Sequence, residues 1–273
     1  MSRAHLLAAA LAALTTACEK SATDAPGTGG ATSSSSADAT TSSTTTATTA
    51  DTGSSSSSGE PITQCPADDT TLPTVDLGTG KDPEMGDFTM EEALAGLPEG
   101  PGPLRAIIDT EMGSITCELF PESAPKGVAN FVGLARGRRP FRKGTHWFKG
   151  TRFYDGLIFH RVIDNFVAQG GDPLGEGTGG PGYKFADEID PALSHTPGTL
   201  AYANSGPHTN TNGSQFYIVA EVDQSGLDGK YVIFGHCAEV DVVKAITEVM
   251  TDANDKPLVP IHMNSIAITR CAP

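Results

Sequence analysis

A low-complexity stretch limits how much of this 273-residue chain can form a packed domain. Every residue from Ala31 to Ser58 is Ala, Ser, Thr, Asp or Gly. Such a segment has no large apolar side chain to bury, so nothing offsets the conformational entropy lost on folding. We therefore expect a flexible linker over residues 18–64, an N-terminal extension with a short helix over 65–102 and one folded domain over 103–273.

The first residues indicate export. An apolar run from Ala4 to Ala17 follows Arg3 and is too short to span a bilayer, but it suits the core of a signal peptide. The residues around Cys18, "LTTAC", resemble a bacterial lipobox, although the Leu lies one place early. We expect a lipoprotein-type signal peptide over residues 1–17 and a lipid anchor on Cys18. Glu19 favours the outer membrane, and the alternative is an ordinary secretory signal cleaved nearby.

Charge and cysteine content exclude several classes of protein. The net charge is −15 and the pI is near 4.7, so a nucleic-acid partner, which needs a basic surface, is not expected. No CxxC or Cys/His ligand spacing is present, so we expect neither a metal nor a cofactor. We expect a monomer. The remaining four cysteines allow two disulfides in any of three pairings, or buried free thiols: Cys65, Cys117, Cys237 and Cys271.

Three helices are predicted from capping residues and periodicity. Thr89 and Glu92 form a capping box in the helix expected over residues 87–97. A second helix is expected from an N-cap at Ser123 through Pro125 in its first turn to a stop at Gly137. The third spans residues 241–250. The residues predicted to face the core are Val128, Phe131, Val132 and Ala135 in the second helix, and Val243, Ile246 and Met250 in the third.

Short strands occupy most of the remaining domain. They are predicted over residues 104–110, 113–120, 157–163, 166–170, 199–203, 215–220, 231–235 and 265–269. In the second of them, Ile115, Cys117 and Leu119 fall on one face. About eight Gly-punctuated strands with two helices indicate a mainly β protein, a closed eight-stranded antiparallel barrel capped by two helices.

One insertion is rich in basic residues. Residues 136–152 hold seven of the eighteen Lys and Arg residues and the only Trp. Contact with an anionic surface is one interpretation, but a solvated loop that balances an acidic body is the favoured one.

Several common kinds of site are excluded. The Gly-rich stretch 175–184 lacks the ending of a phosphate-binding loop, and neither HExxH nor G-x-S-x-G occurs. Asp187 and Glu188 are adjacent, so on an extended segment they point to opposite sides and make a poor acid/base pair; a solvated or internally hydrogen-bonded turn is expected. What remains is an Arg, a few amides and apolar side chains, which suits the binding of a neutral peptide.

The stretch 157–173, "LIFHRVIDNFVAQGGDP", places an arginine inside an apolar strand. Arginine rarely enters a core without a partner. Alternation puts Arg161 and His160 on opposite faces of this strand. We expect His160 to be a core histidine with satisfied hydrogen bonds.

Five blocks in order resemble the cyclophilin family of peptidyl-prolyl cis-trans isomerases: "FHRVIDNFVAQGGDP", "GTGGPGYKFADE", "LAYANSGP", "NGSQFYI" and "LDGKYVIFG". The resemblance runs from about Pro103 to Cys271. It implies the same closed barrel and an enzyme that speeds rotation about Xaa-Pro bonds, here in proline-containing segments of exported proteins.

The resemblance also implies roles for ten residues. Arg161 would donate a hydrogen bond to the prolyl nitrogen, and Gln169 would orient Arg161 and contact the substrate. Phe166, Val167, Tyr217 and Leu227 would line the proline pocket. The backbone at Ala203 and Asn204 would pair with the peptide before the proline, and Gln215 and Tyr231 would complete the wall.

Some residues depart from the family pattern. Tyr217 stands where many members have Phe, so its hydroxyl needs a partner or must point outward. Val167 replaces a common Met, and Gly226 stands where cyclosporin-sensitive members have Trp. The loop "PHTNTNGSQ" is two residues longer than is common. The alternative to an isomerase is a surface lipoprotein that binds Pro-containing peptides without catalysis. Without the resemblance, Phe166, Val167 and Leu227 would be interpreted as core residues and Arg161 as the ion-pair partner of a buried acid.

Overall fold

The computed structural model describes residues 71–98 and 102–270. The predicted signal peptide, the lipid anchor on Cys18 and the linker lie outside these residues, as do Cys65 and Cys271. Within the described ranges, none of the helices has both the length and the apolar character needed to cross a bilayer.

The described residues contain eleven strands and three α-helices. The strands are β1 (Val75–Thr79), β2 (Leu104–Thr110), β3 (Gly113–Leu119), β4 (Phe141–Lys143), β5 (His146–Lys149), β6 (Arg161–Ile163), β7 (Val167–Gly170), β8 (Thr199–Tyr202), β9 (Phe216–Val219), β10 (Ile233–Cys237) and β11 (Met263–Arg270). The helices are α1 (Met90–Leu94), α2 (Pro125–Ala135) and α3 (Val240–Thr247), with a short 3₁₀ turn, η1 (Ser225–Leu227).

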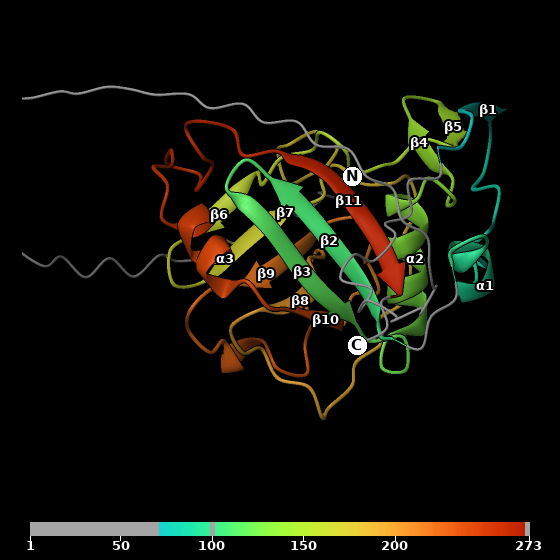
Figure 1. Cartoon of the computed structure of the whole chain (residues 1–273). Coiled ribbons are helices and arrows are strands. Elements are labelled where there is room, and N and C mark those ends of the chain that lie inside the picture. The colour runs from blue at the N-terminus through green and yellow to red at the C-terminus, as the bar shows by residue number, and fades with distance from the viewer. Residues whose placement is uncertain (1–70, 99–101, 271–273) are drawn as a thin grey trace, which may run out of the picture. The chain divides into compact units, whose positions relative to one another are not determined.

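Eight strands form one curled antiparallel sheet in the order β11-β2-β3-β10-β8-β9-β7-β6. These are the eight strands that the sequence predicts. The expectation of a closed barrel is wrong, because the sheet has two ends, at β11 and β6. The segments before β6 and β11 are joined by an isolated bridge between Ile158 and His262 and by a few backbone hydrogen bonds, such as the one from the Phe159 N–H to the Ile261 carbonyl, but β6 and β11 themselves do not pair. Figure 1 shows α2 near one end of strands β2 and β3 and α3 near the other end.

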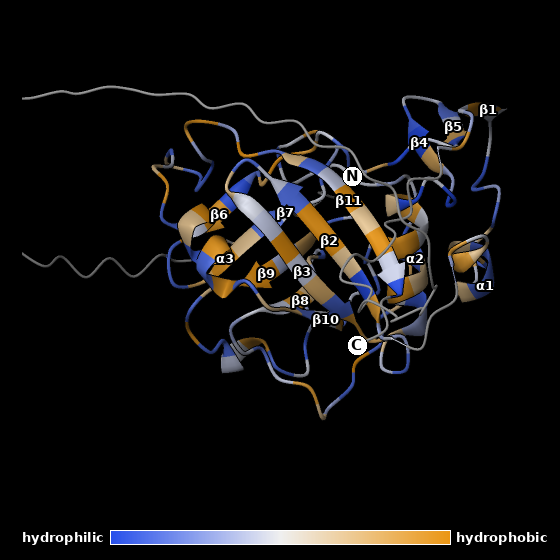
Figure 2. Ribbon diagram, in the orientation of Figure 1, coloured by the Kyte–Doolittle hydropathy of each residue, from blue (hydrophilic) through white to orange (hydrophobic). Residues whose placement is uncertain are grey.

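Alternation along the strands separates two apolar clusters. The larger one is the core between the sheet and the helices; it includes Val162, Ala168 and Phe216 as well as Ile115, Cys117 and Leu119. A smaller cluster on the other face of the sheet contains Val167 and Tyr217. Figure 2 shows apolar residues concentrated in strands and in α2 and α3, while β4 and β5 are mostly hydrophilic.

The helices follow the predicted faces with two corrections. Val128, Phe131, Val132, Ala135, Val243 and Ile246 are buried as expected. Met250 is 77% exposed, because α3 ends at Thr247 and does not reach it. Ser123 is not the N-cap of α2: that residue is Ala124, and Ser123 Oγ donates to Asp190. The Glu188 carboxylate instead accepts the N–H groups of Lys126 and Gly127, satisfying donors that a helix start leaves free.

The N-terminal extension and the basic insertion form one substructure. Strands β1, β5 and β4 make a separate three-stranded sheet, which the sequence did not predict. The predicted capping box is confirmed, since Thr89 and Glu92 bond reciprocally at the start of α1. Trp147 is buried and its Nε1–H donates to the Gly80 carbonyl at 3.0 Å.

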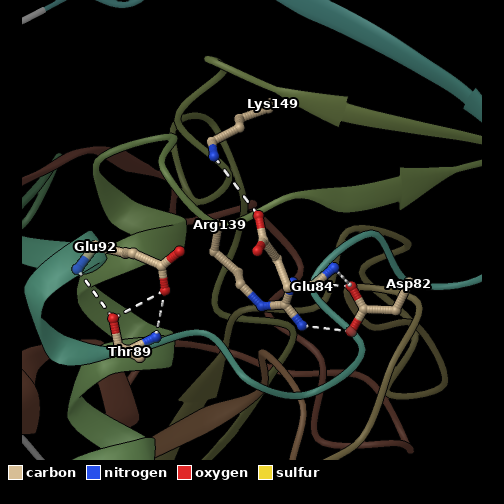
Figure 3. Close-up of polar contacts among 6 residues, drawn as sticks. All are labelled: Asp82, Glu84, Thr89, Glu92, Arg139 and Lys149. Carbon is tan, nitrogen blue, oxygen red and sulfur yellow. Dashed lines mark hydrogen bonds and ion pairs between the residues drawn. The ribbon is translucent and has the colours of Figure 1, made fainter.

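Two arginines of the insertion are buried, so the interpretation of it as a solvated loop is wrong. Arg136 donates to the carbonyl oxygens of Ala93 and Ala95 at the C-terminal end of α1. Arg139 makes two hydrogen bonds to the Asp82 carboxylate, at 2.9 Å and 2.5 Å (Figure 3). Its guanidinium also lies 3.9 Å from the centroid of the Tyr183 ring. These contacts attach the extension to the domain.

Substitution of Asp82 is expected to loosen this attachment. Arg139 is 2% exposed, so Asp82→Ala leaves a buried guanidinium without its carboxylate. We expect a loss of about 1.5–3 kcal/mol in the free energy of unfolding, the range for a hydrogen bond to a charged group. Chemical denaturation measures it. The matched control is Asp76→Ala, whose pair with His146 lies at the surface, so this substitution should change stability much less than Asp82→Ala. Equal losses in both variants would contradict the assignment.

The structure also selects one pairing of the cysteines. Cys117 of β3 and Cys237 of β10 lie directly opposite each other and form a disulfide. Both are fully buried in the core.

Candidate active site

A row of directly paired residues crosses the outer face of the sheet. Arg161 on β6 pairs with Gln169 on β7, Gln169 with Tyr217 on β9, and Tyr217 with Ala201 on β8. Directly opposite residues of antiparallel strands project on the same face. Their neighbours Val162 and Ala168 point into the core. Arg161 therefore lies outside the core, on the face that alternation predicts.

The row borders a cavity of about 190 Å³. Nine of the ten residues singled out in the sequence line it: Arg161, Phe166, Val167, Gln169, Ala203, Asn204, Tyr217, Leu227 and Tyr231. Its apolar wall belongs to the smaller cluster, in which Val167 and Tyr217 are almost fully buried. A larger hollow of about 520 Å³ lies over β3 and β10, but none of these residues lines it. The smaller cavity is thus an apolar pocket with a guanidinium and an amide at its edge.

Arg161 has a partner that sequence reasoning missed. Its Nε lies 3.4 Å from Oδ2 of Asp255, and the Arg161 side chain is 39% exposed. Asp255 follows a turn in the loop after α3 and has a left-handed φ of 61°. The Val162 N–H donates to the Asp255 carbonyl, which holds this loop against β6. Because both side chains are partly exposed, the ion pair leaves the guanidinium accessible from the pocket.

Gln169 is anchored to Gln215. Its Nε2 donates to Gln215 Oε1 at 3.0 Å, and Gln215 Nε2 donates in turn to the carbonyls of Gly177 and Gly179. The orientation of Arg161 by Gln169 stays a prediction: the two residues are neighbours in the row, and Gln169 is held from its other side by Gln215. Gln215 itself lines an adjoining cavity of about 300 Å³, which shares Gln169, Ala203 and Asn204 with the first.

Asp187 fixes the longer loop that follows Ala203. Its carboxylate accepts from the side-chain amides of Asn204 and Asn212 and from the backbone N–H of Asn210. The Ala203 N–H donates to the Gln215 carbonyl. Asp187 and Glu188 thus contact different elements, as expected for residues that do not form a catalytic pair.

His160, the residue before β6, is buried as predicted, but its hydrogen bonds are not satisfied as predicted. It is 5% exposed, and neither ring nitrogen has a hydrogen-bond partner among the described residues. Burial lowers the pKa of His160, and the nearby Lys256 and Arg161 add to this effect against the opposing effect of Asp172. Burial without a hydrogen-bond partner costs a neutral imidazole less solvation free energy than a charged one.

Asp172 organises the loop that holds Gln215. This carboxylate is 1% exposed and accepts the backbone N–H groups of Leu174, Glu176 and Gly177. Burial by itself raises the pKa of Asp172, but backbone donors, those of Gly179 included, together hold the pKa below its usual value. Asp172 thereby supports the carbonyls of Gly177 and Gly179 to which Gln215 donates.

Acid should therefore loosen this loop. The folded-state pKa of Asp172 lies below the value of about 3.9 that an aspartate has in an unfolded chain. Its ionised carboxylate therefore stabilises the fold above about pH 3.9, and this contribution is lost as the pH falls through the folded-state pKa. We expect hydrogen-exchange protection of Leu174, Glu176 and Gly177 to fall below about pH 4. Asp172→Asn should show low protection at every pH, and Asp164→Asn, a surface control, should follow the parent. Protection that does not change with acid would contradict this role.

The Tyr217 hydroxyl points to a partner, as one of the two predicted arrangements requires. It lies 2.9 Å from Nε2 of His195, whose Nδ1 lies 2.9 Å from Oδ1 of Asp228. Sequence reasoning missed His195 and Asp228, just as it missed Asp172 and Asp255. The sequence did contain a signal for His195, because the Tyr217 hydroxyl in an apolar pocket needs a buried hydrogen-bond partner.

Known proteins are similar to this chain over the region that contains the candidate site. Residues 105–268 match the family described as cyclophilin type peptidyl-prolyl cis-trans isomerase/CLD. Peptidyl-prolyl cis-trans isomerase A of Mycobacterium tuberculosis is 46% identical over 169 residues, which cover 60% of this chain and 91% of the relative. Peptidyl-prolyl cis-trans isomerase B of Streptomyces anulatus is 47% identical over 171 residues, which cover 60% and 96%.

Solved structures agree. A crystal structure of a cyclophilin type peptidyl-prolyl cis-trans isomerase from Cryptosporidium parvum superposes with a TM-score of 0.53 and 34% identity, covering 62% of this chain and 98% of that one. The family match spans more than half of the chain and contains the whole candidate pocket. This chain therefore belongs to the family of cyclophilin-type peptidyl-prolyl cis-trans isomerases.

Proposed function

We propose that this isomerase binds the proline ring of a Xaa-Pro segment in the pocket of Phe166, Val167, Tyr217 and Leu227, while Arg161 donates a hydrogen bond to the prolyl nitrogen. The observation that supports this proposal is the row Arg161–Gln169–Tyr217 beside an apolar cavity. A solved relative from Cryptosporidium parvum was crystallised in the presence of the dipeptide Ala-Pro, which fits a pocket for proline.

The chemistry needs no covalent step. Delocalisation of the nitrogen lone pair gives the peptide bond its rotation barrier of about 18–20 kcal/mol. As the bond twists, the nitrogen regains its lone pair and becomes a hydrogen-bond acceptor. A guanidinium is a permanent donor, so it stabilises the twisted state more than the cis or trans state. Only such differential binding accelerates the reaction.

The remaining groups hold the substrate backbone. Gln169, held by Gln215, would form a hydrogen bond with the substrate backbone near the proline. The backbone of Ala203 and Asn204, which follow β8, would pair with the substrate residues before the proline. Since the Ala203 N–H already donates to Gln215, its pairing would use the carbonyl. These contacts would position the twisting bond beside Arg161.

Exchange spectroscopy by NMR on a short Xaa-Pro peptide tests the proposal. Isomerisation without catalyst takes tens to hundreds of seconds, so a small amount of enzyme should produce cis–trans exchange cross-peaks that are absent without it. The alternative, a module that only binds Pro-containing peptides, would shift the peptide resonances with saturation and leave the exchange rate unchanged.

We further propose that the enzyme acts on exported proteins while anchored to a bacterial membrane through a lipid on Cys18. The support lies in the sequence alone: an apolar leader, a lipobox-like "LTTAC" and a linker without large apolar residues. Fractionation of cells that express the parent chain and Cys18→Ala tests this. The parent should sediment with membranes and the variant should be soluble outside the cytoplasm; equal distribution would contradict the anchor.

Cyclosporin should inhibit this enzyme only weakly. Gly226 lies in η1 beside Leu227, in open space, where related sensitive proteins have a Trp. We expect Gly226→Trp to tighten cyclosporin binding about 10- to 100-fold, the scale of one aromatic anchor. Calorimetric titration of the parent, Gly226→Trp and the control Gly226→Ala measures this, since the Ala variant adds no indole. Nanomolar affinity of the parent would show the prediction to be wrong.

A further inference from the structure

A chain of hydrogen bonds runs from the proline pocket to Asp228 through His195. The Tyr217 hydroxyl lies 2.9 Å from His195 Nε2, and His195 Nδ1 lies 2.9 Å from Asp228 Oδ1. The backbone N–H of His195 donates to the same carboxylate oxygen at 2.7 Å. We call Tyr217, His195 and Asp228 the pocket relay.

The relay satisfies groups that could not remain alone. The His195 side chain is 0% exposed and Tyr217 is 5% exposed, whereas Asp228 reaches the surface. A buried hydroxyl or imidazole without a hydrogen bond costs free energy because it has lost its water. His195 is the partner found for the Tyr217 hydroxyl among the described residues. A phenylalanine at this place would need no such partner.

The relay also connects two walls of the pocket. Tyr217 belongs to β9, whereas Asp228 directly follows Leu227 at the end of η1, and Tyr217 and Leu227 both line the cavity. His195 lies in the loop before β8 and is tied to the same turn a second time, because the Gln224 N–H donates to its carbonyl at 2.7 Å. Movement of His195 would therefore move both walls.

The protonation states follow from the partners. A carboxylate only accepts, so His195 carries its proton on Nδ1, and Nε2 accepts from the Tyr217 hydroxyl. Burial lowers the pKa of His195, and the opposing effect of Asp228 does not reverse this. Burial raises the pKa of Tyr217, so the hydroxyl keeps its proton. Two titratable groups contact the His195 ring: the Asp228 carboxylate, which is charged, and the Tyr217 hydroxyl. The Tyr231 ring lies edge-on against the Tyr217 ring.

We propose that His195 is a positioning residue of the proline pocket: its neutral imidazole holds the Tyr217 hydroxyl away from the bound proline and, through Asp228, fixes Leu227 opposite the Tyr217 ring. This inference rests on the proposed proline pocket. A second proton on His195 would occupy Nε2, reverse the hydrogen bond and leave the hydroxyl proton of Tyr217 without its acceptor. Acid should then weaken peptide binding, and it should do so only while Tyr217 is present.

A double-mutant cycle on the full chain tests the coupling. The proteins are the parent, His195→Gln, Tyr217→Phe and the combination of both, and His262→Gln is the matched control. His262 is a surface histidine paired with Glu111, outside the three cavities that the predicted site residues line. Each protein is titrated with one Xaa-Pro peptide over a series from about pH 7.5 down to about pH 4.5, which extends well below an ordinary histidine pKa because burial lowers the pKa of His195. NMR gives the dissociation constant and the exchange rate at saturation, and thermal melting reports folding.

In the parent chain we expect His195→Gln to raise the peptide dissociation constant about five- to twentyfold, the scale of one buried hydrogen bond, with the saturated exchange rate changed less than about threefold. In the Tyr217→Phe chain the same substitution should have less than about a twofold effect. Acid should weaken binding to the parent and to His262→Gln but not to Tyr217→Phe. The imidazole ¹⁵N shifts of His195 in the parent should show the Nδ1–H form at about pH 7.5.

Other outcomes would overturn the inference. An equal effect of His195→Gln with and without the Tyr217 hydroxyl would mean that His195 only stabilises the fold. An Nε2–H tautomer, or acid weakening that persists in Tyr217→Phe, would exclude the relay as the cause. A parent chain that binds and isomerises the peptide while the cycle shows no coupling refutes the relay alone. A parent that neither binds nor isomerises refutes the proposed pocket and the relay with it.

Discussion

Arg161→Ala is expected to lower kcat/KM about 10²- to 10³-fold, the typical effect of removing one transition-state hydrogen-bond donor. Arg161 lies on the outer face of β6 at the edge of the apolar cavity, where the row of paired residues places it beside Gln169. Substrate binding should change much less, because in the proposed pocket the proline ring would be held by Phe166, Val167 and Leu227. Measurement of kcat and of the peptide dissociation constant by NMR exchange separates the two effects.

Folding defects should not account for this loss. The Arg161 side chain is 39% exposed and its pair with Asp255 is at the surface, so Arg161→Ala leaves no buried charge behind. We expect the free energy of unfolding to change by less than about 1 kcal/mol. Arg161→Lys should recover only part of the activity, since an ammonium lacks the planar fork of donors.

Asp255→Asn provides the matched control. It removes the ion pair while leaving Arg161 in place, and it should change kcat/KM by less than about fivefold, because an exposed pair of this kind contributes little. Activity of Arg161→Ala within a few-fold of the parent would refute the role of Arg161 as donor. A loss in Asp255→Asn as large as that in Arg161→Ala would instead locate the function in the ion pair.

The sequence predicts the position of Arg161 because strand alternation is local. Val162 and Ala168 are buried in the core, and Arg161 and Gln169, one residue away, face the cavity. The same local rule orients Ile115, Cys117 and Leu119 inward. The eight strands of the main sheet and the capping box of Thr89 and Glu92 were also predictable, since each depends on neighbouring residues.

Contacts between distant segments were not predictable in this way. Asp255 reaches Arg161 only because a loop with a left-handed residue lies against β6. The helix start at Pro125 is satisfied by Glu188, which comes from a later loop, so the local rule wrongly selected Ser123. Counting strands also cannot show whether the first and last ones pair, and here β6 and β11 remain the two ends of the sheet.

The basic insertion illustrates the same limit. Seven cationic residues within residues 136–152 resemble a solvated loop when read alone. Arg139 is buried only because Asp82, from the extension before the domain, supplies its carboxylate, and Tyr183 covers it. The partner of a buried charge is thus the information that a local pattern lacks.

The cysteine pairing depends on strand order and has a large consequence for stability. Cys117 and Cys237 become neighbours because β3 and β10 are adjacent, although 120 residues separate them in sequence. Closing a loop of this length restricts the unfolded chain, and a disulfide typically contributes about 2–4 kcal/mol in this way. We expect Cys117→Ala/Cys237→Ala to lose about 3–5 kcal/mol in the free energy of unfolding under oxidising conditions.

Reduction distinguishes this effect from lost packing. Both cysteines are fully buried in the core, so the double variant also removes two sulfur atoms from a packed region. Under reducing conditions the parent loses the constraint as well, and the difference between the two proteins should shrink to the packing cost of about 1–2 kcal/mol. Denaturant unfolding with and without a reductant measures both numbers. A parent whose stability does not respond to the reductant, or free thiols at Cys117 and Cys237 in the oxidised protein, would contradict the disulfide as the source of stability. Since neither cysteine lines the candidate pocket, the folded double variant should retain isomerase activity, which separates the stability of this domain from its catalytic groups.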